Sequence, residues 1–159
     1  MLITFLGSFD PPHYGHLNTY LNAQKKFGGN IRICICTNNF KNGLLTIEER
    51  LYISQSLFPS KDIMVYRDKE SITQLVRDSD KIVRGFRDRS DIEESMKLAD
   101  FYAAEPIAHK FEFIKIDEKF TDISSSEIKL RFHDSGYIKR ALNNTAVEIL
   151  QSKKIVANV

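Results

Sequence analysis

The chain has 159 residues, of which 42% are hydrophobic and 28% charged, and this composition is typical of one compact domain over residues 1–159. A chain of this length can bury one sufficient core, which excludes a small scaffold that depends on disulfides or a structural metal. The 23 Lys and Arg residues against 21 Asp and Glu leave a net charge of only +2, so we expect no nucleic-acid partner, and no run of about 18 apolar residues predicts a membrane span.

In chain order, short β-prone runs alternate with longer segments of helical period, the pattern of βαβ units and a parallel sheet. Strands are predicted over residues 2–6, 31–36, 63–66, 81–83 and 111–116. Between them, helices are predicted over 14–27, 46–57, 71–77 and 90–104, followed by two more over 124–132 and 146–153. The expected fold is an α/β fold with an open parallel sheet of about five strands, helices on both faces and additional C-terminal helices.

Several helix starts are marked by capping residues. Thr46 is followed three residues later by Glu49, and Ser124 by Glu127, which is the spacing of a capping box. Asn144 or Thr145 is expected to cap the last helix.

Both cysteines, Cys34 and Cys36, lie in one alternating run of the second predicted strand. Side chains two residues apart in a strand share a face but are too distant for a disulfide. No second cysteine pair or nearby histidine completes a zinc set. We therefore expect reduced, packed thiols and, with no basic segment preceding an apolar run at the start, a cytoplasmic protein.

The loop between the first strand and the first helix has the residues of a phosphate site. It reads Gly-Ser-Phe-Asp-Pro-Pro-His-Tyr-Gly-His over residues 7–16. Ligands gather at the carboxyl ends of parallel strands, where a helix N-terminus offers N–H groups to phosphate. A turn needs neither Ser8 nor two histidines, so we predict that His16 donates a hydrogen bond to a phosphate. Zinc binding by His13 and His16 is not expected, because no third ligand is evident.

Two later segments add cations and hydroxyl groups. Arg84 follows a predicted strand and Arg87 lies three residues on, so both guanidinium groups can reach one crevice and bind phosphate bidentately. Three serines, residues 124–126, stand at a predicted helix start. A helix cap and a phosphate site can coincide at such a position.

These segments carry a family resemblance. The first loop resembles the GxFDPxHxGH signature of the nucleotidylyltransferase superfamily, and the Ile-Ser-Ser-Ser run at residues 123–126 resembles its second signature. Three further features are similar to phosphopantetheine adenylyltransferases. These are Lys41 ahead of a T-x-E-E-R segment at 46–50, the R-G-x-R pattern at 84–87 followed by D-x-E at 91–93, and the chain length. The resemblance runs from Leu2 to about Leu150 and implies a Rossmann-like fold.

The resemblance implies an enzyme that transfers AMP from ATP to 4′-phosphopantetheine, forming dephospho-coenzyme A and pyrophosphate. It further implies Mg²⁺ with the ATP, feedback inhibition by coenzyme A and a cytoplasmic homohexamer. Three alternatives stay open. Two are sister enzymes, a nicotinate mononucleotide adenylyltransferase or a glycerol-3-phosphate cytidylyltransferase, and the third is an inactive nucleotide-binding module of the same fold.

The resemblance also assigns roles to individual residues. The implied catalytic residues are His16, Lys41 and Ser8. The implied acceptor contacts are Ser8, Lys41, Ile72 and Arg84. The implied ATP contacts are Ser8, Phe9, His16, Gly85, Phe86, Arg87, Ser95, Ser124, Ser125 and Ser126. Ser95 stands where the family has an acidic residue, and no protein ligand to the metal is predicted.

Overall fold

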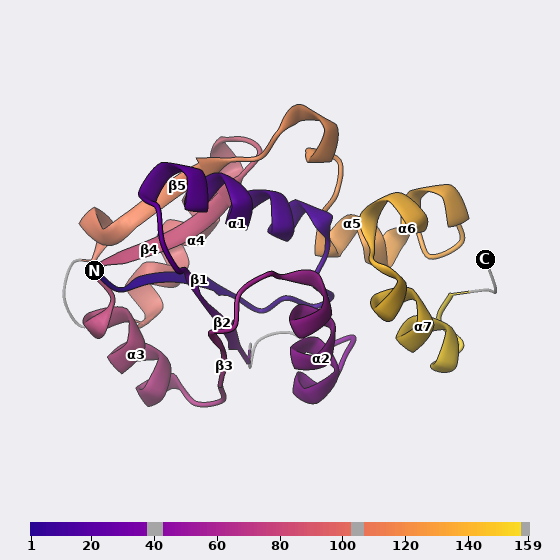
Figure 1. The fold of residues 1–159 in the computed structure, drawn as a ribbon, viewed down its shortest axis with the longest axis horizontal. Coiled ribbons are helices and arrows are strands. Elements are labelled where there is room, and N and C mark those ends of the chain that lie inside the picture. The colour runs from indigo at the N-terminus through magenta and orange to yellow at the C-terminus, as the bar shows by residue number, and fades with distance from the viewer. Residues whose placement is uncertain (38–42, 103–106, 157–159) are drawn as a thin grey trace.

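The computed structural model describes residues 1–37, 43–102 and 107–156 (Figure 1). Strands and helices alternate through the first part as β1 (Ile3–Gly7), α1 (Tyr14–Phe27), β2 (Arg32–Cys36), α2 (Ile47–Leu57), β3 (Ile63–Tyr66), α3 (Lys69–Asp78), β4 (Lys81–Phe86), α4 (Arg89–Tyr102) and β5 (Phe111–Lys115). Three helices follow, α5 (Ser125–Leu130), α6 (Ser135–Ala141) and α7 (Asn144–Ser152). Short 3₁₀ turns, η1 (Ala108–Lys110) and η2 (Glu118–Phe120), flank β5.

The five strands form one parallel sheet in the order β3-β2-β1-β4-β5. From β1 the chain builds outward through β2 to β3, and then returns to place β4 on the other side of β1. Because the direction of winding reverses between β1 and β4, their carboxyl ends leave a crevice between the loops that follow them. This confirms the predicted Rossmann-like α/β fold and places its switch point beside β1.

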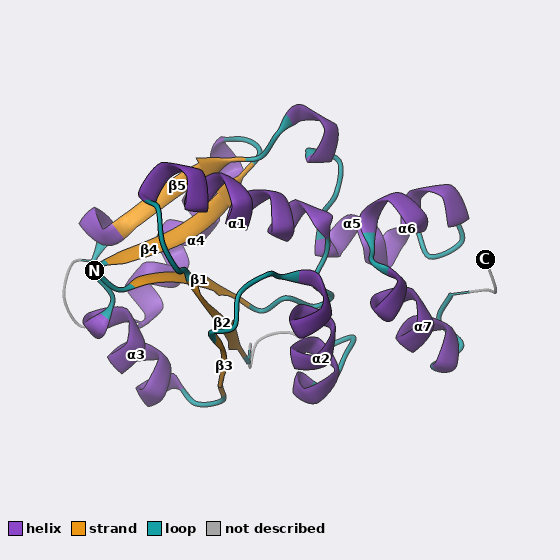
Figure 2. Ribbon diagram, viewed as in Figure 1, coloured by secondary structure: helices purple, strands orange, loops and turns teal. Residues whose placement is uncertain are grey.

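Helices cover both faces of the sheet (Figure 2). On one face, Phe5 and Ile33 pack with Tyr20 of α1 and Leu57 of α2. On the other face, the neighbouring strand residues pack against α3 and α4; this second core includes Leu6, Cys34, Cys36, Ile72, Val76 and Ala99. The inner strands β1 and β2 therefore bury both of their faces, as strands in a doubly covered parallel sheet do.

Both cysteines belong to the core under α3 and α4. They are free and buried, which confirms the prediction of packed, reduced thiols. Burial raises the pKa of both Cys34 and Cys36, so neither is a reactive thiolate at neutral pH.

The last three helices form a third core at one end of the molecule beside α2 (Figure 1). Ile128 of α5 and Ile138 of α6 are fully buried there together with Ile53 of α2 and Leu150 of α7. This cluster fixes the short helix α5 against the rest of the fold, which matters because α5 begins at the predicted serine run.

The predicted elements agree with the structure in most positions and differ at a few ends. The helix over 14–27 is confirmed at both ends, and Thr46 and Glu49 form the predicted capping box. Strand β4 continues three residues beyond the predicted end, because its last residues pair with β5 up to Phe86 opposite Lys115.

The C-terminal helices differ most from the prediction. The structure adds α6, which the sequence analysis did not predict and which begins after the cap Asp134. Helix α7 is capped by Asn143, one residue before the predicted candidates. Helix α5 has the predicted cap, since Ser124 Oγ accepts the Glu127 N–H, but it ends at Leu130. Among the described residues, none of the helices is both long and apolar enough to cross a membrane.

The packing of α5 against the third core can be tested with two substitutions in that helix. Ile128→Ala removes a side chain with no exposed surface and should lower the free energy of unfolding by about 2–5 kcal/mol. Leu130→Ala is the matched control, because Leu130 is 71% exposed and should change it by no more than about 0.5 kcal/mol. Urea unfolding followed by circular dichroism measures both, and equal effects would contradict the packing described for α5.

Candidate functional site

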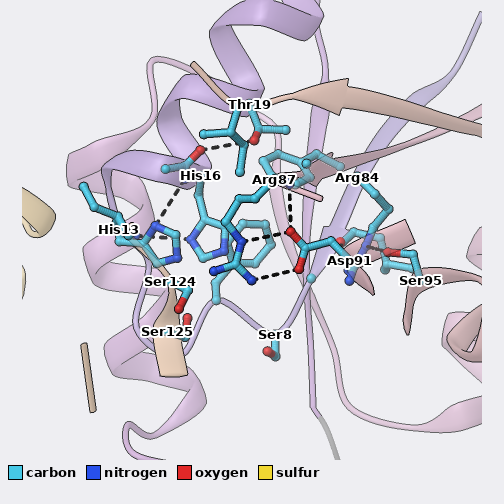
Figure 3. A pocket seen from close by; sticks show the side chains of 18 of the residues that line it. Ser8, His13, His16, Thr19, Arg84, Arg87, Asp91, Ser95, Ser124 and Ser125 are labelled. Carbon is cyan, nitrogen blue, oxygen red and sulfur yellow. Dashed lines mark hydrogen bonds and ion pairs between the residues drawn. The ribbon is translucent and has the colours of Figure 1, made fainter. Parts of the chain in front are cut away.

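A cavity of about 210 Å³ lies at the carboxyl ends of β1 and β4, at the switch point of the sheet. Its walls come from the end of β1 and the loop after it, the start of α1, the end of β4, the first turns of α4, the residue after β5, and the start of α5. Figure 3 shows polar side chains from these segments around one space. Segments more than a hundred residues apart in sequence thus meet at the place where an open α/β sheet binds ligands.

Most of the predicted site residues meet at this cavity. Those that line it are Ser8, Phe9, His16, Arg84, Gly85, Arg87, Ser95, Ser124 and Ser125. Gly85 also has a packing role, because a Cβ there would overlap Thr19 Oγ1 of α1.

Four predicted residues lie elsewhere or outside the described part of the chain. Ile72 is 1% exposed in the core between the sheet and α3 and does not line the cavity. Phe86 does not line it either, and its ring lies against Phe113 of β5. Ser126 lines a smaller neighbouring cavity. Lys41 falls outside the described residues.

His13 and His16 cap the start of α1 reciprocally. The His16 backbone N–H donates to His13 Nδ1 at 3.3 Å, and the His13 backbone N–H donates to His16 Nδ1 at 3.2 Å. The two rings stack with their centroids 3.6 Å apart. Since Nδ1 is the acceptor in each ring, the proton of each neutral imidazole belongs on Nε2. His16 therefore brings an Nε2–H donor to the cavity that it lines.

The surroundings of the two histidines favour their neutral forms. Burial, with a smaller contribution from the positive charge of Arg87, lowers the pKa of His13 to about 3. Burial first, and then His13 and Arg84, hold the pKa of His16 well below its usual value of 6.5. At neutral pH, His16 is thus a hydrogen-bond donor without a charge.

Arg84 is fixed at the cavity by two hydrogen bonds from its guanidinium group. Nη1 donates to the Leu6 carbonyl at the end of β1 at 2.8 Å, and Nε donates to Ser95 Oγ of α4 at 3.1 Å. Ser95 is 1% exposed, so this position, where the family resemblance places an acidic residue, orients an arginine here. Burial lowers the pKa of Arg84, and an anionic ligand beside it would offset that cost.

Arg87 is held differently, by a forked ion pair with Asp91. Nε and Nη2 donate to the two carboxylate oxygens at 2.9 and 2.8 Å, and the Arg87 backbone N–H donates to the same carboxylate at 2.8 Å. The hydrogen bonds from Arg87 lower the pKa of Asp91, and those to Asp91 raise the pKa of Arg87. Arg87 is therefore charged and oriented, while Asp91 partly neutralises it.

Hydroxyl groups line the side of the cavity that α5 provides. Ser124 caps α5, and Ser125 Oγ donates to the Pro11 carbonyl at 3.3 Å. Next to Ser125 and Ser126 lies the smaller cavity, of about 60 Å³, which Ser8 also lines. Ser124 thus both caps α5 and lines the main cavity.

Three charged residues of the smaller cavity were assigned no role from the sequence. They are Asp10, Arg50 and Lys129. Each lies inside or next to a segment that was recognised, in the loop after β1, at the end of the T-x-E-E-R segment, and one turn after the serines of α5. Their spatial relation could not be read from the sequence, since their partners are distant along the chain.

The carboxylates at the site do not assemble a metal centre. Among the described residues, no group of three or more His, Cys, Asp and Glu side chains is placed to hold a metal ion. Asp91 and Glu94 line the main cavity, and both oxygens of Asp91 accept from Arg87. A divalent ion here would therefore depend on ligands that a bound phosphate supplies.

Comparison with known proteins identifies relatives along most of the chain. The model of a family described as cytidylyltransferase-like matches residues 4–131. A phosphopantetheine adenylyltransferase of Clostridium perfringens (strain SM101 / Type A) is 30% identical over 154 residues, which cover 94% of this chain and 92% of the relative. One from Clostridium novyi (strain NT) is 27% identical over 150 residues, 92% of each chain. One from Staphylococcus carnosus (strain TM300) is 28% identical over 126 residues, 77% of this chain and 78% of the relative.

The buried histidine pair predicts a specific pH dependence of stability. The pKa of His13 is about 3 in the folded chain against 6.5 ordinarily, so the unfolded chain binds the proton more tightly between these values. The stability contributed by neutral His13 is complete above pH 6.5 and is lost as the pH falls below it. Between pH 7 and pH 5 this group should lower the free energy of unfolding by about 2 kcal/mol.

His13→Asn isolates this contribution, because asparagine is also a good N-cap but does not titrate. The fall in unfolding free energy from pH 7 to pH 5 should be about 2 kcal/mol smaller in His13→Asn than in the wild type. Urea unfolding at the two pH values measures it. The same pH dependence in both proteins would refute the neutral, buried state of His13.

Proposed function

Because the chain belongs to the cytidylyltransferase-like family, we propose that it is a phosphopantetheine adenylyltransferase, which transfers AMP from ATP to 4′-phosphopantetheine. The observation that carries the proposal is the meeting of a neutral histidine donor, two arginines and several serine hydroxyls at the switch point of the sheet. Such a set of donors suits two phosphate-bearing substrates. Relatives of that name that match over 92–94% of this chain support the choice of reaction.

In the proposed reaction, an oxygen of the acceptor's terminal phosphate attacks the α-phosphorus of ATP. A new P–O bond forms to the α-phosphorus, and the bond to the bridging oxygen of the β-phosphate breaks. The electron pair leaves with pyrophosphate, and the product is dephospho-coenzyme A. Since the attacking phosphate is already an anion at pH 7, the protein needs to position two polyanions and stabilise the charge that develops between them.

His16 is proposed to contact the α-phosphate. Its Nδ1 is occupied by the His13 backbone N–H, so Nε2–H is the donor available to a phosphate oxygen. A neutral imidazole held by a helix cap is oriented before the substrate binds, and such donors lower the barrier without reorganisation. His16 acts in this scheme as a hydrogen-bond donor and not as a base.

The two arginines are proposed to divide the phosphates between them. Arg84, together with Ser8 and Lys41, would hold the acceptor phosphate, since Arg84 is anchored deep at the ends of β1 and β4. Arg87 would hold the β- and γ-phosphates together with the serine run of α5. Ser124 and Ser125 lie at the start of α5 on the wall of the main cavity, and Ser126 lines the smaller cavity beside it.

The proposal includes the further properties that the family resemblance implies. We propose that Mg²⁺ accompanies ATP, held by its phosphates, and offsets part of their negative charge. We also propose that coenzyme A, the end product, inhibits the enzyme, and that the chain forms a homohexamer in the cytoplasm.

The proposed activity is tested by pyrophosphate release from the purified chain with Mg-ATP and 4′-phosphopantetheine. We expect release with this acceptor and none with nicotinate mononucleotide, or with CTP and glycerol 3-phosphate. Release with one of the other pairs would assign the chain to a sister enzyme of the family. Silence with all three pairs would favour a nucleotide-binding module and end the proposal.

The role of His16 gives a second test within the same assay. His16→Ala removes one oriented donor and should lower kcat about 10²- to 10³-fold. His16→Gln should keep the capping box, because glutamine is favoured at that helix position, and it separates the loss of the imidazole from the loss of the cap. His109→Ala is the control, since His109 is exposed and absent from the cavity wall. Unchanged turnover in His16→Ala would refute the proposed contact.

A further inference from the structure

Asp10 is a buried carboxylate in the smaller cavity beside the main site. It is 6% exposed and lies in the loop after β1. Its Oδ2 accepts the Leu44 N–H at 2.7 Å, and its Oδ1 accepts the Leu45 N–H at 2.9 Å. The loop that carries Ser8 is thereby tied to the segment that leads into α2.

Two cations complete the surroundings of this carboxylate. Arg50 Nε of α2 lies 3.5 Å from Oδ1, and Lys129 Nζ of α5 lies 3.5 Å from Oδ2. Arg50 also donates to the Leu45 carbonyl, from Nε at 3.0 Å and from Nη2 at 2.9 Å, and its Nη1 donates to the Ser8 carbonyl at 3.4 Å. Arg50 therefore contacts both segments that Asp10 joins.

These contacts connect the segment that leads into α2 with two segments that carry predicted phosphate contacts, the loop after β1 and the start of α5. Arg50, which lies beside Asp10, donates to the backbone carbonyl of Ser8. Lys129 links Asp10 to the helix that begins at the serine run. All of them line the cavity of about 60 Å³ beside the main site. A carboxylate at this place repels phosphate, so its presence needs a reason other than ligand binding, and its hydrogen bonds to the backbone provide one.

We propose that Asp10 is a positioning residue for the transfer reaction, which fixes Ser8 and the start of α5 for phosphate binding through Arg50 and Lys129. The proposal rests on the proposed function for the identity of the reaction. Positioning and simple electrostatics predict opposite changes in phosphate affinity when Asp10 loses its charge. Removing the negative charge of Asp10 should favour phosphate by electrostatics, whereas loss of positioning should weaken binding and catalysis.

The first test compares Asp10→Asn with wild type. The amide of Asn can still accept one backbone N–H but cannot serve as the counter-ion of Arg50 and Lys129. We expect kcat/KM for 4′-phosphopantetheine to fall about 10- to 100-fold, the effect of a small misplacement. Asp62→Asn is the matched control. Asp62 also pairs with an arginine, Arg32, at 3.0 Å, but it precedes β3 at the amino ends of the strands and should leave kcat/KM unchanged.

Gly43→Ala disturbs the same arrangement without touching the carboxylate. A Cβ at Gly43 would overlap Nη2 of Arg50, so this substitution should displace the guanidinium group from Asp10 and Ser8. The proposal predicts a fall in kcat/KM in the same direction as for Asp10→Asn. Full activity in Gly43→Ala would contradict the part assigned to Arg50.

A double-mutant cycle separates positioning from a general structural role. If Asp10 acts through Ser8, the losses from Asp10→Asn and Ser8→Ala should not multiply, and the double variant should be little worse than the more damaged single variant. Losses that multiply, with a lowered melting temperature, would overturn the proposal in favour of a merely structural carboxylate.

Binding of inorganic tripolyphosphate tests the role of Asp10 without assuming the proposed reaction. Its dissociation constant, measured by calorimetry, should rise several-fold in Asp10→Asn, and the same cycle with Ser8→Ala should be non-additive. If the wild type transfers nucleotide to no acceptor, the proposed function fails and this binding cycle still decides the role of Asp10. Unchanged or tighter binding in Asp10→Asn would overturn the proposal.

Discussion

The site depends on the reciprocal hydrogen bonds between His13 and His16 at the start of α1. These bonds give the His13 backbone N–H a partner and give the His16 N–H, which also donates to the His13 carbonyl, a second acceptor. They also determine which ring nitrogen carries the proton, and burial keeps both rings neutral. One local interaction thus begins the helix, sets the tautomer and supplies an uncharged donor at the switch point of the sheet.

The positive charge that the proposed reaction needs comes from arginines with unlike partners. Arg84 is anchored by neutral oxygens, from Leu6 and Ser95, and the negative charges of Glu94 and Asp91 act on it from the same cavity. Arg87 donates two hydrogen bonds to Asp91, from Nε and Nη2. The negative charge of Asp91 therefore weakens the attraction between Arg87 and a bound phosphate. The guanidinium group of Arg84 lies at the ends of β1 and β4, which is the place proposed for the acceptor phosphate.

Local patterns in the sequence predicted most helices and strands, because residues close together in the sequence determine where these elements form. The period of apolar side chains predicted the helix over 14–27 at both ends, and the spacing of Thr46 and Glu49 predicted a cap that forms. The end of β4 was predicted too early, because pairing with β5 and not local preference extends it. Helix α6 was not predicted, because it has only seven residues, one of them a glycine, and its apolar side chains show only weak helical periodicity.

At the site, residue types could be predicted but their partners could not. The sequence pointed to Ser8, His16, Arg84 and Arg87, which the fold brings together, whereas Ile72 is buried in the core under α3. The ties that hold the site join residues far apart, such as Asp10 to Leu44 and Leu45. The sequence spacing between Asp10 and the segment at Leu44 does not indicate that one carboxylate accepts both the Leu44 and the Leu45 N–H groups. A positioning residue of this kind becomes visible only when the backbone groups it satisfies are known.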